Sequence, residues 1–360
     1  MDMKKAVARV IASENFTREE MSEIVRTIMT GDATAAQIGG FLVGLNVKGE
    51  TVEEIVGAAS TMRKLAVPVT TTAGNLVDTC GTGGSGSNKF NVSTASAFVA
   101  AAAGASVAKH GNRAATSKSG SADLLEAAGA NIMLAPENVA RCIETVGVGF
   151  LFALSHHSAM KHAIGPRREL GVRTIFNLLG PLTNPARAGR QLIGVFDSAW
   201  VRPIAEVLKN LGSQHVMVVH SHDGLDEISI SAATSIAELK DGAITEYELE
   251  PSDFGFERCD LDSLRVGDSS ESLALVKASF DGSHTGAAGI VAMNAGAAIY
   301  VSGLSTNLND GIDMAKETMA SGKASGKMSE FVDFTRELSQ QELSQQELSQ
   351  PELSQQEKGN

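Results

Sequence analysis

Apolar residues in the first seventy positions recur at the spacing of buried helix faces. Two sets follow the i, i+3, i+4, i+7 pattern: Met21, Ile24, Val25 and Ile28, then Ile38, Phe41, Leu42 and Leu45. Capping boxes, in which glutamate or glutamine follows a threonine by three positions, mark three helix starts: Thr17 to Glu20, Thr34 to Gln37 and Thr51 to Glu54. Residues 1–70 are therefore predicted to form three helices. So small a domain needs the rest of the chain or a second subunit to cover its apolar faces.

From Gly74 onward, short apolar segments alternate with helical ones. Strands are predicted over 76–79, 106–109, 149–153, 191–196 and 215–220, with a helix over 201–211. This alternation is typical of a mainly parallel sheet with helical crossovers. Polar residues alternate in 245–250, which predicts an edge or antiparallel strand. The predicted fold class is α/β, with a small all-helical domain and a larger α/β domain whose central, mainly parallel sheet is flanked by helices.

The C-terminal segment differs in composition from the rest of the chain. Residues 337–356 repeat Glu-Leu-Ser-Gln-Gln four times, with Pro351 in place of one glutamine. A five-residue period gives no continuous apolar stripe on a helix, and one leucine per repeat cannot support a core. We therefore expect 337–360 to be a disordered, low-complexity tail.

Composition and charge narrow the possible functions. The 360 residues are 43% hydrophobic and carry a net charge of −12, which opposes a general nucleic-acid or anionic-membrane surface. Three cysteines without a CxxC spacing favour a reducing compartment, and neither a signal peptide nor an apolar run of about 18 residues is evident. We expect a cytoplasmic protein with no nucleic-acid or membrane partner.

A glycine-rich loop and the segments that follow it predict a polyphosphate site. Four glycines lie at 81, 83, 84 and 86, where backbone N–H groups can approach an anion closely. Ser93 and Thr94 then open an alanine-rich helix whose first turn has free N–H donors. Lys109 and Arg113 follow the next short strand. Two cations, a helix N-terminus and a glycine loop are expected to converge on one anionic group.

Other interpretations of this region rest on spacing. The loop fits the dinucleotide pattern GxGxxG, but no carboxylate follows about 20 residues later, and Gly86 is not followed by the Lys-Ser/Thr of a Walker loop. A flexible surface turn remains the alternative for the loop taken alone. Ser119 or Ser121 could cap the helix predicted over 123–128, contact a ligand, or in the case of Ser121 do both.

Two adjacent carboxylates, Asp226 and Glu227, follow the apolar strand predicted over 215–220. Ligands of α/β sheets gather at the carboxyl ends of strands. Mg²⁺ accepts a site with two protein carboxylates, because phosphate oxygens and water can complete its coordination. The pair therefore indicates a magnesium site, with a solvated turn as the alternative, and no His/Cys cluster has the spacing of a zinc site.

Together, these blocks resemble the anthranilate phosphoribosyltransferase family over residues 3–335. The resemblance also includes Arg167 to Gly171 and Phe176 to Leu182. It implies a nucleoside-phosphorylase-like fold, with a helical domain of 1–70 plus helices from about 160–185, and an α/β domain over the rest of 74–335. It also implies transfer of the phosphoribosyl group of phosphoribosyl pyrophosphate to the amine of anthranilate, and a homodimer formed through the helical domain.

Carried over position by position, the resemblance implies the residues of each part of the site. Lys109, His110 and Arg167 are the expected catalytic residues, although His110 and His157 could instead be packed structural histidines. Mg²⁺, with two ions per subunit, would be held by Ser93, Asp226 and Glu227. Anthranilate would contact Gly81, Asn112, His157, Met160 and Arg167. Phosphoribosyl pyrophosphate would contact Gly81, Gly84, Ser85, Lys89, Asn91, Val92, Ser93, Thr94, Lys109, His110, Gly111, Asn112, Arg113, Ala114, Ala115, Thr116, Ser117 and Ser121.

Two positions depart from the usual family pattern. Ser85 stands where many members have aspartate, and Lys89 stands where a small hydroxyl residue is common. Losing a carboxylate and gaining a cation beside the pyrophosphate is expected to reduce the need for a second metal ion. The rival functions are a pyrimidine nucleoside phosphorylase, which also has a Lys-His-Gly motif, and a nucleic-acid-binding relative. The carboxylate pair counts against the first, and the acidic charge of the chain counts against the second.

Overall fold

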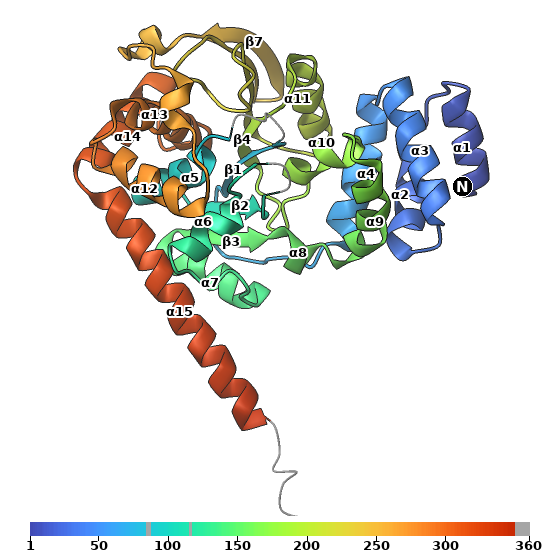
Figure 1. The fold of residues 1–360 in the computed structure, drawn as a ribbon, viewed down its shortest axis with the longest axis horizontal. Coiled ribbons are helices and arrows are strands. Elements are labelled where there is room, and N and C mark those ends of the chain that lie inside the picture. The colour runs from blue at the N-terminus through green and yellow to red at the C-terminus, as the bar shows by residue number, and fades with distance from the viewer. Residues whose placement is uncertain (84–87, 115–116, 350–360) are drawn as a thin grey trace, which may run out of the picture.

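The computed structural model describes residues 1–83, 88–114 and 117–349, and it has a helical part beside a larger α/β part (Figure 1). The helical part contains α1 (Met3–Ile11), α2 (Arg18–Thr30), α3 (Ala35–Lys48) and α4 (Val52–Leu65). All three predicted capping boxes are confirmed. The prediction of only three helices is wrong, because α1 precedes them. Asp2 caps α1, which buries Met3, Ala6 and Val10.

Two helices from the middle of the chain pack against this N-terminal group. They are α9 (Lys161–Leu170) and α10 (Ile175–Leu182), whose buried residues share one apolar cluster with those of α2, α3 and α4. The α9 helix contacts α2 and α3, and α10 contacts α3 and α4. A segment more than a hundred residues away in sequence thus completes the core of the helical part.

The α/β part is built on a seven-stranded sheet in the order β3-β2-β1-β4-β5-β6-β7. Strands β3, β2, β1, β4 and β5 are parallel, and β6 and β7 are antiparallel additions. The predicted mainly parallel sheet and the edge strand near 245–250 are confirmed, whereas β6 was not predicted. The strands are β1 (Val77–Gly81), β2 (Val107–Gly111), β3 (Val148–Phe152), β4 (Arg190–Gly194), β5 (His215–Ser221), β6 (Thr234–Lys240) and β7 (Ala243–Leu249).

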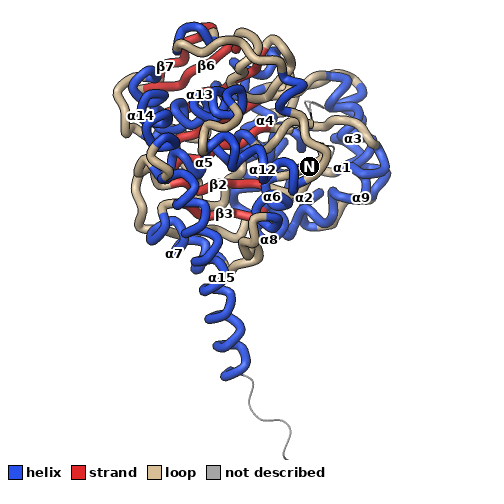
Figure 2. Tube along the Cα trace, turned by 60° about the vertical axis from the view of Figure 1, so that its left-hand side comes forward, coloured by secondary structure: helices blue, strands red, loops and turns tan. Residues whose placement is uncertain are grey.

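Helices cover both faces of the sheet (Figure 2). On β5, Met217 and Val219 join the core formed with α5 (Val92–Ala102) and α13 (Thr285–Ser302), while Val216 and Val218 join the core of the helical part. This alternation places the helical part and α11 (Val201–Asn210) on one face of the sheet and α5 and α13 on the opposite face. The remaining helices are α5 (Val92–Ala102), α6 (Ser121–Ala127), α7 (Pro136–Val146), α8 (Ala153–His156), α11 (Val201–Asn210), α12 (Ser269–Phe280), α13 (Thr285–Ser302), α14 (Leu308–Ala320) and α15 (Lys323–Ser349).

The expectation that no apolar run reaches the length of a membrane span is wrong for α13. By length and composition its 18 residues could cross a bilayer, yet 89% of the helix is buried inside the protein. It contacts α5, α12 and α14 and packs on β1, β4 and β5. The helix is apolar on all sides because protein surrounds it, as expected of a central core helix.

The prediction that 337–360 is disordered is wrong for its first part, because α15 continues to Ser349. Leu338 is fully buried, and the Glu342 carboxylate accepts hydrogen bonds from the Ala135 N–H at 3.0 Å and from the Asn138 amide. The first repeat therefore needs no continuous apolar stripe, because it extends a helix that already packs against the α/β part and it forms hydrogen bonds with residues near α7. The C-terminal end of α15 extends away from the body (Figures 1 and 2), and 350–360 lie outside the described residues.

A matched pair of leucines in the repeat tests this docking. Leu338 has no exposed surface, whereas Leu343 is 58% exposed. We expect Leu338→Ala to lower the free energy of unfolding by about 2–4 kcal/mol, because it leaves a cavity, and Leu343→Ala to change it by less than about 0.5 kcal/mol. Urea denaturation of the two variants measures the difference. Equal, small effects would show that α15 is not packed beyond residue 337.

Candidate active site

The predicted site residues lie where the parallel strands end. Gly81 closes β1, Gly111 closes β2 and Gly194 closes β4, while Asp226 follows β5 by a short turn. The first turn of α5 begins at Val92, after the glycine loop that leaves β1. Parallel strands bring these ends to one edge of the sheet, as the sequence predicted.

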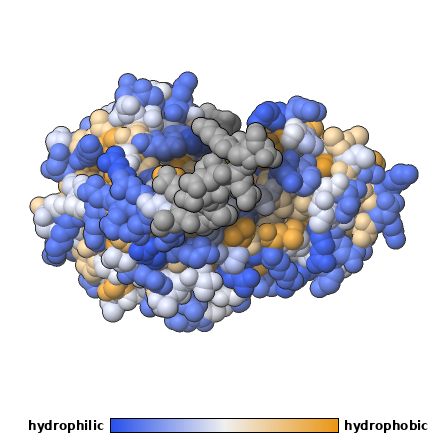
Figure 3. Space-filling model, turned by 90° about the horizontal axis from the view of Figure 1, so that it is seen from below, coloured by the Kyte–Doolittle hydropathy of each residue, from blue (hydrophilic) through white to orange (hydrophobic). Residues whose placement is uncertain are grey.

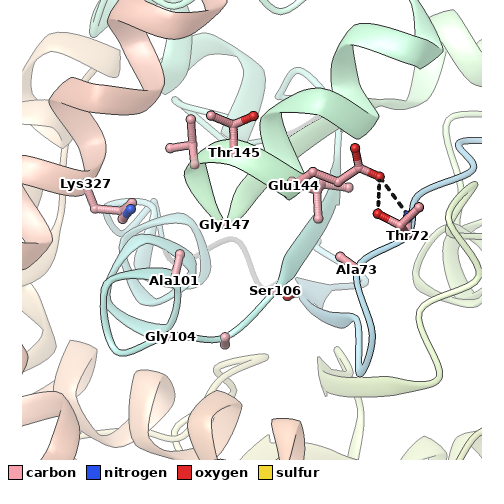
Figure 4. A pocket seen from close by; sticks show the side chains of 12 residues that line it. Thr72, Ala73, Ala101, Gly104, Ser106, Glu144, Thr145, Gly147 and Lys327 are labelled. Carbon is pink, nitrogen blue, oxygen red and sulfur yellow. Dashed lines mark hydrogen bonds between the residues drawn. The ribbon is translucent and has the colours of Figure 1, made fainter.

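A surface hollow at the opposite edge contains none of these residues. It has a volume of about 330 Å³ and is lined by residues that precede β2 and β3, among them Ser106 and Gly147 (Figure 4). Its one carboxylate, Glu144, accepts hydrogen bonds from the Thr72 N–H at 2.7 Å and the Thr72 hydroxyl at 2.9 Å. The hollow is thus separate from the candidate site.

Close backbone packing brings the carboxylate pair to the glycine loop. The Gly83 N–H donates to Asp226 Oδ2 at 3.0 Å. A Cβ on Gly81 would overlap the Asp226 carboxylate, and a Cβ on Gly194 would overlap the Asp226 carbonyl. Asn294 fixes the backbone directly after the pair, because its side chain bonds both the N–H (3.0 Å) and the carbonyl (2.8 Å) of Ile228. Glycine at 81 and 194 is therefore required to hold Asp226 over the ends of β1 and β4.

Lys89 lies against this carboxylate pair. Its Nζ is 3.2 Å from Asp226 Oδ1 and 3.3 Å from Glu227 Oε2, and all three side chains are nearly buried. Burial alone would raise the pKa of Asp226, but attraction to Lys89 lowers it below its usual value. Burial, reinforced by Asp226, outweighs Lys89 for Glu227 and raises its pKa to about 7. Burial opposes the charge on Lys89, yet the two carboxylates raise its pKa.

The carboxylate pair and the start of α5 could hold a divalent cation. The Ser93 backbone bonds the Glu227 carboxylate, whose buried Oε2 has the Lys89 ammonium as its ion-pair partner at 3.3 Å. Carboxylate and hydroxyl oxygens suit Mg²⁺, which keeps part of its coordination for water and phosphate. No group of three or more His, Cys, Asp or Glu side chains within 1–83, 88–114 and 117–349 is arranged as a protein-only metal site. Ser93, Asp226 and Glu227 thus fit a magnesium ion shared with a substrate.

Lys109 is the buried cation of the site. Its Nζ donates to the Thr79 carbonyl at 2.7 Å and to Ser93 Oγ at 3.4 Å. Burial lowers its pKa, while attraction to Asp78 partly restores it. Lys109 therefore places a positive charge beside the first turn of α5, as the sequence predicted.

Asp78, which was not among the predicted site residues, is buried beneath the site and holds neighbouring segments by hydrogen bonds. Its Oδ1 accepts from the His110 N–H at 3.1 Å, and its Oδ2 accepts from Asn184 Nδ2 at 2.8 Å. The same Asn184 amide donates to the Ala108 carbonyl at 2.8 Å. Asp78 and Asn184 tie β1 and β2 to the segment after α10. One signal for Asp78 was available beforehand, namely a carboxylate inside an apolar strand, because such a group must be paired when it is buried.

His110 and His157 face each other with ring centroids 5.3 Å apart. His110 Nδ1 lies 3.1 Å from the Gly180 carbonyl, so this nitrogen carries the proton and Nε2 has a lone pair. The Nε2 atoms of both rings are buried without a hydrogen-bond partner among the described residues. Burial lowers the pKa of His110 well below its usual value and that of His157 to about 4, so both rings are neutral near pH 7.

These low pKa values predict that acid destabilises the fold. Between pH 6.5 and 4 the unfolded chain protonates His157 and the folded chain does not, so stability is complete above pH 6.5 and falls as the pH drops. Between pH 7 and pH 4.5 we expect the free energy of unfolding to fall by roughly 2–3 kcal/mol more in the wild type than in His157→Gln. Denaturant titrations at the two pH values measure this, and identical losses in both proteins would refute it.

Arg167, on α9, contacts α10, the helix that also contacts His110. Its guanidinium lies 5.1 Å from the Phe176 ring centroid, and Phe176 is one helical turn from Gly180, which bonds His110. Among the described residues no carboxylate forms an ion pair with Arg167, and burial lowers its pKa. Met160 is partly buried and packs against the apolar cluster of the helical part, which contains Phe176. Arg167, with His157 and Met160, therefore lies on the helical side of the site.

Other predicted residues have structural partners. Arg113 makes a bidentate pair with Glu126 and lies 3.2 Å from Asp123, so the structure does not bring its guanidinium to the glycine loop. Asn91 Oδ1 accepts from the Ser119 and Ser272 hydroxyls, both at 2.7 Å. Ser121, at the start of α6, donates its hydroxyl to the Asn112 carbonyl at 3.2 Å. These contacts shape the connection after β2.

Some of the remaining predicted residues have contacts in the structure, and others lie outside the described residues. The Thr94 hydroxyl is buried without a hydrogen-bond partner among described residues, Val92 is buried beside it, and Gly111 must lack a Cβ because Ser121 packs against it. Ala114 donates its N–H to Asp123 at 2.9 Å, and the Ser117 hydroxyl donates to the Ser119 carbonyl at 3.3 Å. Gly84, Ser85, Ala115 and Thr116 lie outside the described residues.

Known proteins resemble the chain in both sequence and fold. Residues 73–325 match the a/b domain of the glycosyl transferase family, and residues 4–66 match its helical bundle domain. The anthranilate phosphoribosyltransferase of Teredinibacter turnerae is 58% identical over 339 residues, covering 93% of this chain and 99% of that protein.

Two solved structures share the complete arrangement of the two parts. The crystal structure of anthranilate phosphoribosyltransferase from Thermus thermophilus superimposes with a TM-score of 0.87 at 42% identity, covering 92% of this chain and 99% of that one. The Saccharomyces cerevisiae enzyme in complex with PRPP and Mg gives a TM-score of 0.84 at 26% identity, covering 93% and 98%. With near-complete coverage and a sheet edge that assembles Lys109, Ser93 and the Asp226–Glu227 pair, the chain belongs to the anthranilate phosphoribosyltransferase family.

Proposed function

We propose that this chain transfers the phosphoribosyl group of 5-phosphoribosyl 1-pyrophosphate to the amine of anthranilate, releasing pyrophosphate. The reaction is the glycosyl transfer of tryptophan biosynthesis that its relatives' name denotes. One observation carries the proposal: a buried lysine, the N-terminus of α5 and a buried carboxylate pair converge at the carboxyl edge of the sheet. This set of groups suits a substrate with several phosphates and a bound divalent ion.

Ser93, Asp226 and Glu227 are the residues that would hold Mg²⁺, and we propose two ions per subunit. When bound, Mg²⁺ supplies positive charge that neutralises the pyrophosphate leaving group. The donor set supports this role because it consists of two nearly buried carboxylates and a hydroxyl, whose oxygens are the kind of ligand that Mg²⁺ prefers. Two carboxylates and a hydroxyl leave room for phosphate oxygens and water around the ion.

The chain's own groups supply the rest of the chemistry. As the bond between C1 of the ribose and the pyrophosphate oxygen breaks, negative charge grows on the leaving group. Lys109 and the N–H groups at the start of α5 stabilise that charge more in the transition state than in the ground state. The aromatic amine attacks C1 as the pyrophosphate leaves and releases one of its protons to water, and holding the two substrates in line contributes the remaining large part of the rate.

Arg167 is the proposed ligand of the anthranilate carboxylate. Its planar guanidinium can make two parallel charge-assisted hydrogen bonds with a carboxylate. Stacking on Phe176 orients it, and no described carboxylate competes for it. The neutral rings of His110 and His157 give the aromatic substrate an uncharged surface.

Anthranilate is fluorescent, so its consumption tests the activity directly. The purified protein is mixed with anthranilate, phosphoribosyl pyrophosphate and Mg²⁺, and each component is omitted in turn. We expect consumption only in the complete mixture. A further reaction offers inorganic phosphate and a pyrimidine nucleoside. Phosphorolysis there, with no loss of anthranilate, would replace the proposal by the phosphorylase alternative.

The helical part also carries the proposed dimer interface. Val47 is 82% exposed and Val43 is 40% exposed, one turn apart on α3, and Ile11 on α1 is 74% exposed. The face seen from below is mainly hydrophilic, with hydrophobic side chains gathered near the junction of the two parts and smaller groups of them elsewhere (Figure 3). We infer a cytoplasmic homodimer. Sedimentation of the wild type and Val47→Asp tests the dimer, and a monomeric wild type would refute it.

A further inference from the structure

Lys89 has a backbone that is held in place from both sides. Lys89 pairs with Arg265 in an isolated antiparallel bridge. On either side of it, the Val266 N–H donates to the Asn88 carbonyl at 2.9 Å, and the Phe90 N–H donates to the Leu264 carbonyl at 3.1 Å. The Phe90 side chain is buried. The side chain of Lys89 can therefore change direction without movement of its backbone.

The carboxylates that Lys89 meets are equally fixed. Asp226 is held by the Gly83 N–H and by close packing on Gly81 and Gly194. Glu227 is held through the Ser93 backbone. The Lys89 ammonium lies within 3.3 Å of an oxygen from each carboxylate, and the exposed fractions of the three side chains are 9%, 10% and 13%. The Lys89 ammonium thus offsets negative charge on a rigid, largely dehydrated pair.

A divalent ion and this ammonium cannot occupy the same position. A metal bound by both carboxylates would lie about 2.0–2.1 Å from their oxygens, well inside the present ion-pair distances. Repulsion between a divalent and a monovalent cation a few ångströms apart in a partly buried site also opposes their binding at the same time. The ammonium must leave the pair before metal binds there.

We propose that Lys89 is an internal cation of the metal pocket, which occupies the Asp226–Glu227 pair in the free protein and yields it to a divalent ion only when a polyphosphate arrives. This inference rests on the proposed function, because the pyrophosphate of the donor substrate offers Lys89 its alternative anionic partner. The free protein then binds divalent ions weakly at this pair, and metal and donor bind cooperatively.

Mn²⁺ binding to the free protein, followed by electron paramagnetic resonance without either substrate, tests the proposal. We expect Lys89→Met to bind Mn²⁺ at least tenfold more tightly than the wild type. Lys89→Arg, which keeps the charge, should remain weak. Lys209→Met, which removes an exposed lysine of α11, should match the wild type. Adding Asp226→Asn to Lys89→Met should abolish the gain, which assigns it to the carboxylate pair.

A second titration, with phosphoribosyl pyrophosphate present, completes the test. We expect the donor to tighten Mn²⁺ binding in the wild type more than in Lys89→Met, after subtraction of binding to the free donor. Equal Mn²⁺ affinities of the free wild type and Lys89→Met would overturn the proposal. If the stability of Lys89→Met is reduced, Lys89→Gln replaces it in the comparison. Tighter Mn²⁺ binding by Lys89→Gln than by the wild type and Lys89→Arg would support the proposal, and equal affinities of the three would overturn it. The first titration contains no anthranilate and no donor, so failure of the transfer reaction is distinguishable from failure of this inference.

Discussion

Replacing Lys109 by methionine is expected to lower kcat/KM for the phosphoribosyl donor by about 10²–10³-fold, the cost of losing one preorganised group that stabilises developing negative charge. Lys109 suits this role because its ammonium is held between the Thr79 carbonyl and Ser93 Oγ. A charge fixed before the reaction needs no reorganisation as the pyrophosphate leaves. Steady-state kinetics with varied donor concentration measure the effect.

The control for this substitution must separate chemistry from folding. Lys109 also attracts the buried Asp78, so its loss leaves Asp78 with the amide of Asn184 and the N–H of His110 as its partners. Thermal denaturation of Lys109→Met and of Asp78→Asn/Lys109→Met reports that structural cost. A folded Lys109→Met with kcat/KM within tenfold of the wild type would contradict the role given to Lys109.

Replacing Arg167 by glutamine is expected to raise KM for anthranilate by about 100-fold and to leave KM for the donor nearly unchanged. Two charge-assisted hydrogen bonds to a carboxylate are lost, and about 3 kcal/mol corresponds to roughly this factor. Lysine at the same position keeps the charge but not the planar fork, so Arg167→Lys should recover only part of the affinity. Initial rates at saturating donor measure both constants.

Arg168 provides the matched control. It neighbours Arg167 on α9 but is exposed, whereas Arg167 is partly buried and stacks on Phe176. Arg168→Gln should therefore change KM for anthranilate by less than threefold. If Arg168→Gln gave the larger increase, the carboxylate site would belong to Arg168, and the orientation by Phe176 would have no function in binding.

The elements that could be predicted are those with a strong local signal. Thr17, Thr34 and Thr51 each form the expected capping box, and the apolar strands 215–220 and 191–196 appear as β5 and β4 within two residues at each end. In both cases a local sequence pattern coincides with the tertiary environment. Such agreement between local and global preferences makes an element predictable.

The elements that escaped prediction depend on contacts made far along the chain. Strand β6 has a polar residue at four of its seven positions, and its place is set by hydrogen bonds with β5 and β7. Residues 337–349 continue as helix because Leu338 is buried and Glu342 accepts hydrogen bonds from Ala135 and Asn138, about two hundred residues earlier. Sequence periodicity carries no information on such partners.

The site shows the same division. The strand ends and the glycine loop predicted where the site lies, and the family resemblance named Lys109, Ser93 and the carboxylate pair. It could not predict that Arg113 pairs with Glu126, or that Lys89 points to Asp226 and Glu227, since these pairings depend on side-chain directions in the folded chain. Asp78 and Asn184 also escaped prediction, because their role is to position other groups through hydrogen bonds.

The central claim is that one site couples loss of pyrophosphate to capture by the anthranilate amine. The most direct test measures pyrophosphate released and anthranilate consumed in the same reaction, with wild type and Arg167→Gln side by side. We predict one pyrophosphate per anthranilate in both proteins, with the variant slower at low anthranilate. Release of pyrophosphate that does not depend on anthranilate, or anthranilate consumption without pyrophosphate, would contradict the account.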